Sequence, residues 1–454
     1  MAPMNRTTYI EKCALDTPVP ISASNQSALN DAFKHKSGLV RTLFVLSVLV
    51  PLFCLALITA PIYALTFIFY GRPPITPTVS NLFRYTVLVF SYPHVRPYSR
   101  MMILYVILRK LLLIPIFGVG WHLDEMLYGG ELDKQEIISP VFLISGARSG
   151  STTTGHLLDN DPQFVSPAGV MTLFPFLWLW KTISYFSRLG LLPSPESFSA
   201  AVIAKVSKDA PEFVARHEFD PLKPDTFEVP WLVNRGFFQI GPEFGADEMI
   251  KAVPVSDKNI DVEMWDDFVS YTDRIMRKVL CFNCKRSGKN RIMIKGHFLA
   301  VAKTLEAKYP NSRFITVVRD PAKRLESLLN FMIANRLLIV ETPLIPTIRD
   351  VLAIGEAITR LELDYMREEE NFFASGGRRK TCIQFAEYVA NTKLAVAKCY
   401  AVINEDGQVP KEILSAIERG REEHKNRSKM KYRIKLSLGE FGIDEEKFKK
   451  LCKK

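Results

Sequence analysis

Cysteine and glycine are scarce in this sequence and proline is close to its ordinary frequency, which excludes several classes of protein. The 454 residues contain 7 Cys, 23 Gly and 28 Pro. This composition excludes a collagen-like chain, a disordered chain and a small disulfide-stapled scaffold. The one CxxC pair, Cys281 and Cys284, has no second pair at metal-binding spacing, so no zinc site is expected. In an oxidising compartment that pair, and Cys382 with Cys399, are candidate disulfides.

Acidic residues are fewer than basic ones. The sequence has 48 Asp and Glu against 59 Lys and Arg, a formal net charge of +11. A basic surplus favours a polyanionic partner, which could be a nucleic acid, a membrane surface, a phosphorylated cofactor or an acidic glycan. The sequence contains no recognisable nucleic-acid-binding module, so nucleic acid is not expected among the partners.

Charge is absent altogether from the 28 residues Leu43–Tyr70. Because about 20 apolar residues cross a bilayer, residues 39–70 are predicted to form an uncleaved transmembrane anchor, with a buried core helix as the alternative. A modest excess of basic residues before this run predicts a single-pass type II membrane protein. Residues 1–38 would then be a flexible cytosolic tail, and everything after the anchor would lie across the membrane.

Residues 71–134 are predicted to be a stem followed by a membrane-proximal helix. The prolines of GRPPITPTVS and YPHVRPYSR are expected to prevent regular structure over residues 71–100. The stretch Met101–Trp121 is apolar, but Arg109 and Lys110 lie at its centre. These charges favour an interfacial or domain-packed amphipathic helix over a second membrane span.

The remaining residues, 135–454, have the size of one large α/β domain, and its first segment has the pattern of an anion site. Val141–Ile144 is an apolar strand, Ser145–Ser151 is a loop of small residues, and Thr152–Leu158 has helical character. A helix that opens directly from such a loop presents unpaired backbone N–H groups and a favourable dipole to an anion. The glycines, Gly146 and Gly150, allow close approach, and hydroxyl groups add donors at Ser149, Ser151, Thr152 and Thr153. A strand–turn–helix without a ligand is the alternative.

A second segment has a related pattern about 170 residues later. Phe314–Val318 is a buried strand that ends at Arg319, and Ser327 follows within the next predicted helix. An arginine at the carboxyl end of a strand and a hydroxyl eight residues on can converge on one phosphate. Alone, the Arg-Asp-Pro sequence is also compatible with a helix cap. Just upstream, Lys295 ends the strand of a predicted βαβ unit and would face the same crevice.

Together these segments resemble the PAPS-dependent sulfotransferases, in particular the membrane-anchored Golgi type, over about residues 140–450. The resemblance implies an α/β fold with a P-loop-like parallel sheet flanked by helices. It implies that Arg148 and residues Ser149–Thr153 hold the 5′-phosphosulfate, and that Arg319 and Ser327 hold the 3′-phosphate. Ser151 stands where the family usually has threonine. The basic stretch near the C-terminus is similar to the family's closing loop, which makes Lys425 and Arg427 further candidates for the 3′-phosphate; a solvated charged face is the alternative.

The general base is less well determined by the sequence. Some relatives carry a carboxylate soon after the first loop, but VSPAGV at residues 165–170 has none. The segment RHEFDPLKPDTFEVPWLVNRGF resembles an acidic loop of membrane-type relatives. It makes Glu228 the first candidate, with His217 and Asp225 behind it, and His297 could also act on an acceptor hydroxyl. Each of these residues could instead have a purely structural role. The aromatic side chains between residues 174 and 186 could form a core helix or wall an acceptor pocket.

The sequence therefore predicts transfer of a sulfonate group from PAPS to a hydroxyl or amine of a glycan, a lipid or a small molecule. The expected site residues are Arg148, Lys295, Glu228 and His297 for catalysis, and Arg148, Ser149, Gly150, Ser151, Thr152, Thr153, Arg319, Ser327, Lys425 and Arg427 for PAPS. No metal is expected. The expected location is the Golgi, or else the ER, with a luminal catalytic domain whose sequon at Asn426 would be accessible. The alternatives are a membrane-anchored scaffold that has lost catalysis and a P-loop kinase. The kinase is disfavoured because three residues, and not the four of a Walker A motif, separate Gly146 from Gly150, and because Ser151 replaces the Walker lysine.

Overall fold

A five-stranded parallel sheet lies at the centre of the molecule. The computed structural model describes residues 4–452 apart from 34–38, 94, 238–239, 253–261, 288–290, 337–345, 376, 405 and 428–431. The strands, in the spatial order β2-β3-β1-β4-β5, are β2 (Phe164–Val165), β3 (Arg291–Gly296), β1 (Val141–Ile144), β4 (Arg313–Val318) and β5 (Lys380–Gln384). Every neighbouring pair is parallel. The predicted α/β class and parallel sheet are confirmed.

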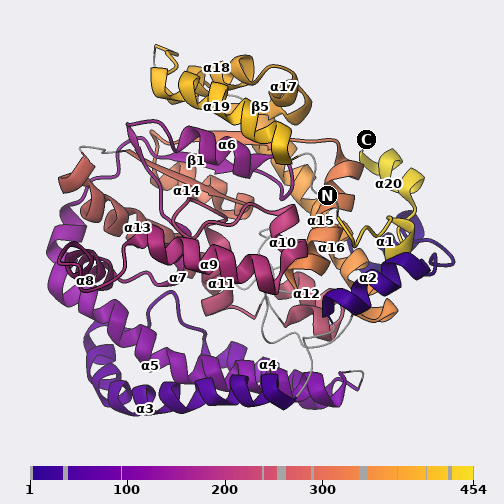
Figure 1. Cartoon of the computed structure of the whole chain (residues 1–454), viewed down its shortest axis with the longest axis horizontal. Helices are drawn as coiled ribbons and strands as arrows, with labels where there is room; N and C mark the ends of the chain where they lie inside the picture. The colour runs from indigo at the N-terminus through magenta and orange to yellow at the C-terminus, as the bar shows by residue number, and fades with distance from the viewer. Residues whose placement is uncertain are drawn as a thin grey trace.

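Both faces of the sheet are buried, as a parallel sheet requires. Successive side chains of β1 point to opposite faces, so Leu143 and Phe142 enter different hydrophobic clusters. Above the sheet in Figure 1 lie α6 (Ser151–Leu158), α17 (Phe385–Ala390), α18 (Thr392–Ile403) and α19 (Lys411–Arg427). The other face packs on α13 (Val262–Ser287), α14 (Ala302–Lys308), the short helix η2 (Leu299–Val301) and α16 (Ile348–Ala374). The two layers leave the carboxyl ends of β1, β3 and β4 as the place where a ligand can bind.

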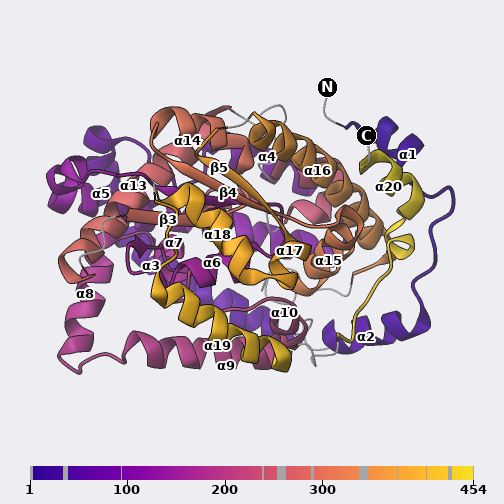
Figure 2. The same cartoon turned by 90° about the horizontal axis from the view of Figure 1, so that it is seen from above.

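Shorter helices complete the body, and several of them line the cavity described below. They are α7 (Gly169–Leu173), α8 (Leu177–Arg188), α9 (Pro195–Asp209), α10 (Pro211–Arg216), α11 (Glu228–Arg235), η1 (Gly241–Phe244), α12 (Ala246–Ala252) and α15 (Pro321–Asn335). Of these, α15 begins where the sequence predicts, because Asp320 caps it and Pro321 occupies its first turn. The view from above shows α9, α10 and α19 along one side of the sheet (Figure 2).

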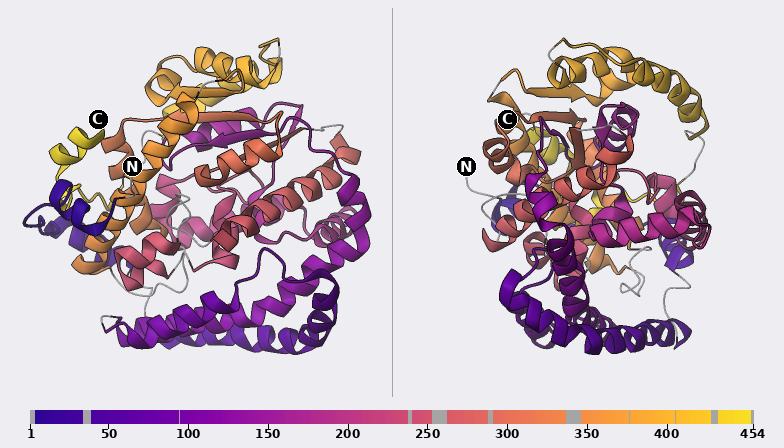
Figure 3. Two further views of the ribbon diagram at one scale, coloured as in Figure 1. Left: turned by 180° about the vertical axis from the view of Figure 1, so that it is seen from behind. Right: turned by 90° about the vertical axis from the view of Figure 1, so that its left-hand side faces the viewer.

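Three N-terminal helices form a separate layer under the sheet: α3 (Leu39–Tyr70), α4 (Val79–Ser91) and α5 (Pro97–Lys134). Figures 1 and 3 show them side by side along the bottom of the molecule. We call these helices the α3–α5 layer. The expected stem is corrected here, because residues 79–91 are helical. Prolines flank this segment without interrupting it, and Thr78 caps the helix by accepting a hydrogen bond from Asn81 N.

The expected flexible tail is also corrected, because it is folded onto the C-terminal end of the chain. Within residues 1–38 the structure has α1 (Arg6–Lys12) and α2 (Ala23–Phe33), which join a cluster containing α15, α16 and α20 (Glu445–Cys452). Tyr9, Leu29 and Phe33 are buried in it. A β-bridge joins Ala14 to Ile443, and Asn25 Nδ2 donates to Glu440 Oε1 at 3.0 Å. The polar composition concealed the few apolar residues that carry this packing.

The candidate disulfides do not form in this structure. Cys281, Cys382 and Cys399 are free thiols. Cys382 is exposed on β5, whereas Cys399 is fully buried in α18, so their side chains do not face one another. The side chain of Cys284 lies outside the described residues, but its partner Cys281 is buried as a thiol in α13.

Candidate active site

The loop between β1 and α6 has a tightly turned backbone. Arg148 has φ +66° and Gly150 has φ +104°, the left-handed region that glycine adopts without strain and arginine rarely adopts. The Ser149 hydroxyl donates to Gly146 O at 2.6 Å, so this hydroxyl closes the loop from within. Ser149 is fully buried, whereas Ser151, Thr152 and Thr153 line a cavity. The structure therefore gives Ser149 a role in shaping the loop.

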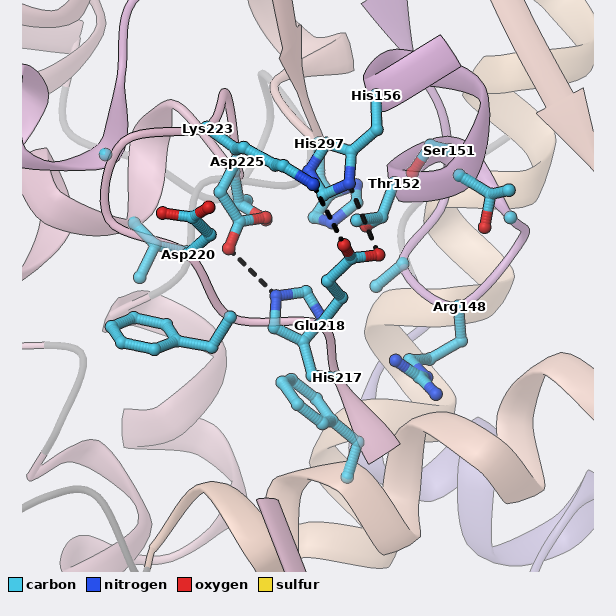
Figure 4. A pocket seen from close by; sticks show the side chains of 18 of the residues that line it. Arg148, Ser151, Thr152, His156, His217, Glu218, Asp220, Lys223, Asp225 and His297 are labelled. Carbon is cyan, nitrogen blue, oxygen red and sulfur yellow. Dashed lines mark hydrogen bonds and ion pairs between the residues drawn. The ribbon is translucent and has the colours of Figure 1, made fainter. Parts of the chain in front are cut away.

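The cavity lies at the carboxyl ends of the strands and has a volume of about 1270 Å³. Its lining includes Gly150, Arg319, Glu228 and His297, from segments that the sequence predicted separately. Figure 4 shows part of this lining, with side chains from α6 and from the segment after α10 facing one another. The two predicted half-sites thus belong to one cavity.

A chain of polar contacts crosses this cavity from α6 to α10. Lys295 Nζ, on β3, donates to Thr152 Oγ1 and lies 2.9 Å from Asp225 Oδ1. The second oxygen of Asp225, Oδ2, is 2.8 Å from His217 Nε2 (Figure 4). Burial alone would raise the pKa of Asp225, but the Lys295 charge and the hydrogen bond from His217 hold that pKa well below its ordinary value. Asp225 is therefore an ionised link that fixes the lysine on one side and the imidazole on the other.

A second group of contacts joins the first loop to α15. Arg148 Nε donates to Ser327 Oγ at 3.1 Å, and its guanidinium lies over the Phe331 ring. Arg319 Nη1 donates to Arg148 O at 3.1 Å, and Arg319 stacks on Phe385. Among the described residues neither Arg148 nor Arg319 has a carboxylate at ion-pair distance. Two unneutralised guanidinium groups in one cavity are suited to a polyanionic ligand.

The pKa of Arg148 is lowered to about 10, chiefly by burial; Tyr432 opposes this shift, and the positive charges of Arg216 and Arg319 add to it. A guanidinium that lies buried beside other cations is stabilised when an anion binds next to it. These clustered guanidinium groups supply the positive charge that a nucleotide bearing two phosphates needs. The residues of the cavity therefore fit such a ligand.

Glu228 and His297 are in direct contact next to Lys295. The backbone N–H of His297 donates to Glu228 Oε1 at 3.0 Å, while Glu228 Oε2 is buried without a hydrogen-bond partner among the described residues. Burial raises the pKa of Glu228 to about 7. A Cβ at Gly296 would come within 2.3 Å of Oε2, so glycine at this position allows the carboxyl to approach the strand.

His297 itself is held as a neutral ring. Its Nδ1 lies 2.5 Å from Ser145 O and donates to that carbonyl. Burial lowers the pKa of His297 to about 3, and the nearby Lys295 charge acts in the same direction. A ring that is neutral and fixed by its Nδ1–H positions the loop. Glu228 is the stronger candidate for a proton acceptor, since its pKa is near neutrality and one of its oxygens has no partner.

The rest of the cavity is mostly apolar. One wall comes from α7 and α11, and the other from α9, α10, α15 and α16. The apolar residues that line these walls are Val170, Leu173, Phe174, Phe198, Val202, Phe213, Phe219, Val229, Leu232, Phe331, Met332, Ile358 and Leu361. Phe174, from the aromatic run, lines the cavity, whereas Phe176 and Trp180 are core residues. A bound molecule thus meets a large apolar surface beside the charged groups of the cavity.

Some residues of the site were not anticipated, and others cannot be placed. Arg216, Glu362 and Tyr365 line the cavity without having been singled out. Arg216 opens the acidic-loop segment in which only His217, Asp225 and Glu228 were singled out, whereas the surroundings of Glu362 and Tyr365 carry no motif. Lys425 and Arg427 fall at the end of α19, where the side chains lie outside the described residues.

Comparisons with known proteins agree with this geometry. Residues 140–406 match the model of a sulfotransferase family. None of the curated proteins matches the sequence. Sulfotransferase STF9 from Mycobacterium avium superposes with a TM-score of 0.55 at 15% identity, covering 87% of this chain and 94% of that one. Sulfotransferase STF1 from Mycobacterium tuberculosis gives a TM-score of 0.52 at 13% identity, covering 87% of this chain and 97% of that one. At these identities the two structures show a shared fold.

Proposed function

This chain belongs to the sulfotransferase family, since the family match covers more than half of it, and we propose that it transfers a sulfonate group from PAPS to an alcohol. PAPS supplies an activated sulfonate, whose sulfur the acceptor oxygen attacks while the bridging phosphate oxygen leaves. The observation that carries the proposal is the single cavity lined by Thr152, Arg148 and Arg319, with the buried Lys295 donating to Thr152 directly behind its wall.

Lys295 and the N-terminus of α6 are assigned to the reacting end of the donor. The ammonium of Lys295 already lies at hydrogen-bond distance from Thr152 Oγ1, at the first turn of that helix. Positive charge held there stabilises negative charge that develops on a leaving oxygen. Asp225 holds the lysine in place, so its position does not depend on the ligand.

Arg319 and Ser327 are assigned to the 3′-phosphate end. Arg148 now contacts Ser327, so it lies nearer this end than the sequence pattern alone suggested. We therefore assign Arg148 to a bridging place between the two phosphates, and Lys295 replaces it as the principal cation at the 5′ end. The stacking of Arg319 on Phe385 keeps its guanidinium from rotating away.

Glu228 is assigned as the general base. Its pKa of about 7 allows it to accept a proton from the acceptor hydroxyl near neutral pH. The His297 N–H orients one oxygen and leaves the other for that proton. His217, bound to Asp225, positions the segment that leads from α10 into α11.

The apolar walls favour an acceptor whose hydroxyl is attached to a large hydrocarbon body, such as a lipid alcohol, over a glycan. A glycan would leave many hydroxyl groups facing side chains that cannot hydrogen-bond them. The Golgi location stays a prediction from the resemblance.

Ligand-dependent thermal stability tests the donor assignment. PAP at about 100 times its dissociation constant should stabilise the protein by about 2.7 kcal/mol. Adenosine 5′-phosphate, which lacks the 3′-phosphate, should stabilise it far less, and so should ATP with magnesium. A thermal stability that does not change when PAP is added would contradict the proposal. Stabilisation by PAP without transfer to any long-chain or polycyclic alcohol in detergent micelles would favour a binding protein that has lost catalysis.

A further inference from the structure

The outer face of the α3–α5 layer is apolar and uncovered. On α3, Val50, Leu57, Ile58, Leu65, Ile68 and Phe69 are each 61–76% exposed, and on α4, Val79, Phe83 and Phe90 are 66–82% exposed. The 25 residues Leu46–Tyr70 form a candidate membrane span of which only 11% of the most apolar window is buried. A core helix would be mostly covered, so this face needs a partner.

The direction of α3 is set by α5, because the two helices run side by side in the same sense. Tyr63 packs on Gly118, where a Cβ would come within 2.2 Å of the ring. One turn further along both helices, Thr66 Oγ1 is 2.7 Å from His122 Nδ1. Near the beginning of both, Leu49 packs against a cluster that contains Met102 and Val106. The axis of α3 therefore follows that of α5.

The first half of α5 lies along the underside of the globular body, and beyond Pro115 its second half rises along the side of the body toward α13 (Figures 1 and 3). In its first half, Lys110 Nζ donates to Asn234 O of α11 at 3.2 Å. In its second half, Asp124 pairs with Lys278 of α13 at 2.9 Å, and both side chains are fully buried. A helix held to the body in both of its halves cannot point away from the body, and α3, which packs along it, cannot either.

The segments before and after α3 also lie on one side. Residues 4–33 pack on α15, α16 and α20, and residues 71–134 pack on α8, α11 and α13. If α3 crossed a bilayer, one of these two segments would have to leave the body. Tilting the whole layer into the bilayer would instead place the Asp124–Lys278 pair in hydrocarbon, where charges are strongly disfavoured.

We propose that the α3–α5 layer lies flat in one leaflet of a lipid bilayer, with the outer faces of α3 and α4 immersed at the boundary between headgroups and acyl chains. The occupant is lipid rather than protein, because α3 carries no charge over the 28 residues Leu43–Tyr70, so that its exposed side matches hydrocarbon over that stretch. Both termini and the cavity are then on the same side of the membrane.

The acceptor wall is close to this layer. Phe174, which lines the cavity, packs on Phe117 of α5 at 6.4 Å between ring centroids. A lipid alcohol taken from the leaflet would therefore have only a short way to travel, which agrees with the proposed acceptor class. The membrane proposal does not depend on that class, since it rests on the α3–α5 layer alone.

Flotation with phosphatidylcholine vesicles tests the face. The purified full chain should float with the vesicles, and the double variant Ile68→Lys, Phe83→Lys should float about tenfold less. The matched control is Leu394→Lys on α18, which is also exposed but lies on the opposite side of the molecule, and it should float like the wild type. Equal stabilisation of all three proteins by PAP would show that they are folded. Wild-type protein that stays unbound and forms dimers through this face would overturn the proposal in favour of a second copy.

Cysteine accessibility and terminal tags test the orientation. Cys54 on α3 is exposed in the structure and should become protected from a water-soluble maleimide when vesicles are added, whereas Cys382 on β5 should stay reactive. In sealed membrane vesicles, tags at the two termini should be digested together or protected together. Digestion of one tag with protection of the other would overturn the proposal and restore the single transmembrane span.

Discussion

The two ends of the cavity were assembled in different ways, although they form one site. At the donor end, each contact comes from a short segment at the end of a strand: the loop after β1, the end of β3 and the start of α15. At the acceptor end, single side chains from α7, α9, α10, α11, α15 and α16 each contribute a small part of an apolar wall. The donor end binds a ligand with fixed charges, whereas the acceptor end needs only to exclude water and fit a shape.

This difference predicts two kinds of mutational effect. Donor-end residues act through charge at fixed positions, so that single substitutions should change kcat or nucleotide affinity by orders of magnitude. Acceptor-end residues act through apolar contact spread over many side chains, so that each should change acceptor KM by a few-fold. Four kinetic and binding predictions test this contrast, from the largest effect to the smallest, and a fifth concerns stability.

Removing the base should have the largest effect. General-base catalysis contributes about 10²–10⁴-fold, so Glu228→Gln should lower kcat by that factor while PAP still binds. In the wild type, Glu228 must be ionised to act, so kcat should rise with pH and reach half its maximum near pH 7. The variant should lose this pH dependence. If the variant kept the wild-type dependence of kcat on pH, the general base would be His217 and not Glu228.

The same carboxyl has a predictable effect on stability. Its pKa is raised by folding, so its contribution to stability is complete below its unfolded pKa and is lost as the pH rises through about 7. Glu228→Gln removes this loss. The difference in Tm between variant and wild type should therefore grow in favour of the variant from pH 5 to pH 8, as measured by thermal unfolding.

Replacing the lysine should have the next largest effect. Loss of one preorganised donor at developing charge costs about 10²–10³-fold in kcat, so Lys295→Ala should lower kcat by that factor with a smaller change in KM for PAPS. Lys303→Ala, an exposed lysine of α14, is the control and should be neutral. If Lys295→Ala changed KM alone, the lysine would hold the ground state and would not stabilise the leaving oxygen.

The elements that carry the donor end could be predicted from sequence, because each is a local pattern. The apolar strands β1 and β4 and the helix α6 appear within one residue of their expected bounds, and α15 follows Arg319-Asp320-Pro321 as expected. The edge strand β5 was not predicted, since its sequence KTCIQ is mostly polar and partly exposed. The two-residue strand β2 is too short to have a pattern.

The contacts between these elements could be predicted only in part. The sequence placed Lys295 at a strand end facing the crevice, but its partner Asp225 is 70 residues away on a loop with no periodicity. The packing of residues 4–33 on the C-terminal helix was missed for a related reason. Tyr9, Leu29 and Phe33 are separated by polar residues, and only α15, α16 and α20, more than 280 residues later, provide the surface that buries them.

Arg319→Ala should act on affinity rather than on kcat. A charge-assisted hydrogen bond contributes about 1.5–3 kcal/mol, so the dissociation constant for PAP should rise by about 10–150-fold. Adenosine 5′-phosphate, which has no 3′-phosphate, should bind the variant and the wild type alike. Lys323→Ala on the exposed side of α15 serves as the control. Calorimetric titration with both nucleotides measures the ratio, and an unchanged preference for PAP would remove the 3′-phosphate assignment.

The smallest effect should come from a substitution in the acceptor wall. It should change KM for the acceptor without changing KM for PAPS, and so it distinguishes the two ends of the cavity. Ile358 of α16 lines the cavity, so Ile358→Val removes one methylene from the surface that an apolar acceptor contacts. One methylene contributes about 0.8 kcal/mol, which raises KM for a lipid alcohol about fourfold and leaves KM for PAPS unchanged. Ile354→Val, one turn earlier on the same helix and buried away from the cavity, removes the same group from the core and should change Tm but neither KM. If Ile358→Val instead raised KM for PAPS, the apolar wall would belong to the nucleotide, and the division of the cavity into a charged donor end and a hydrocarbon acceptor end would have to be reversed.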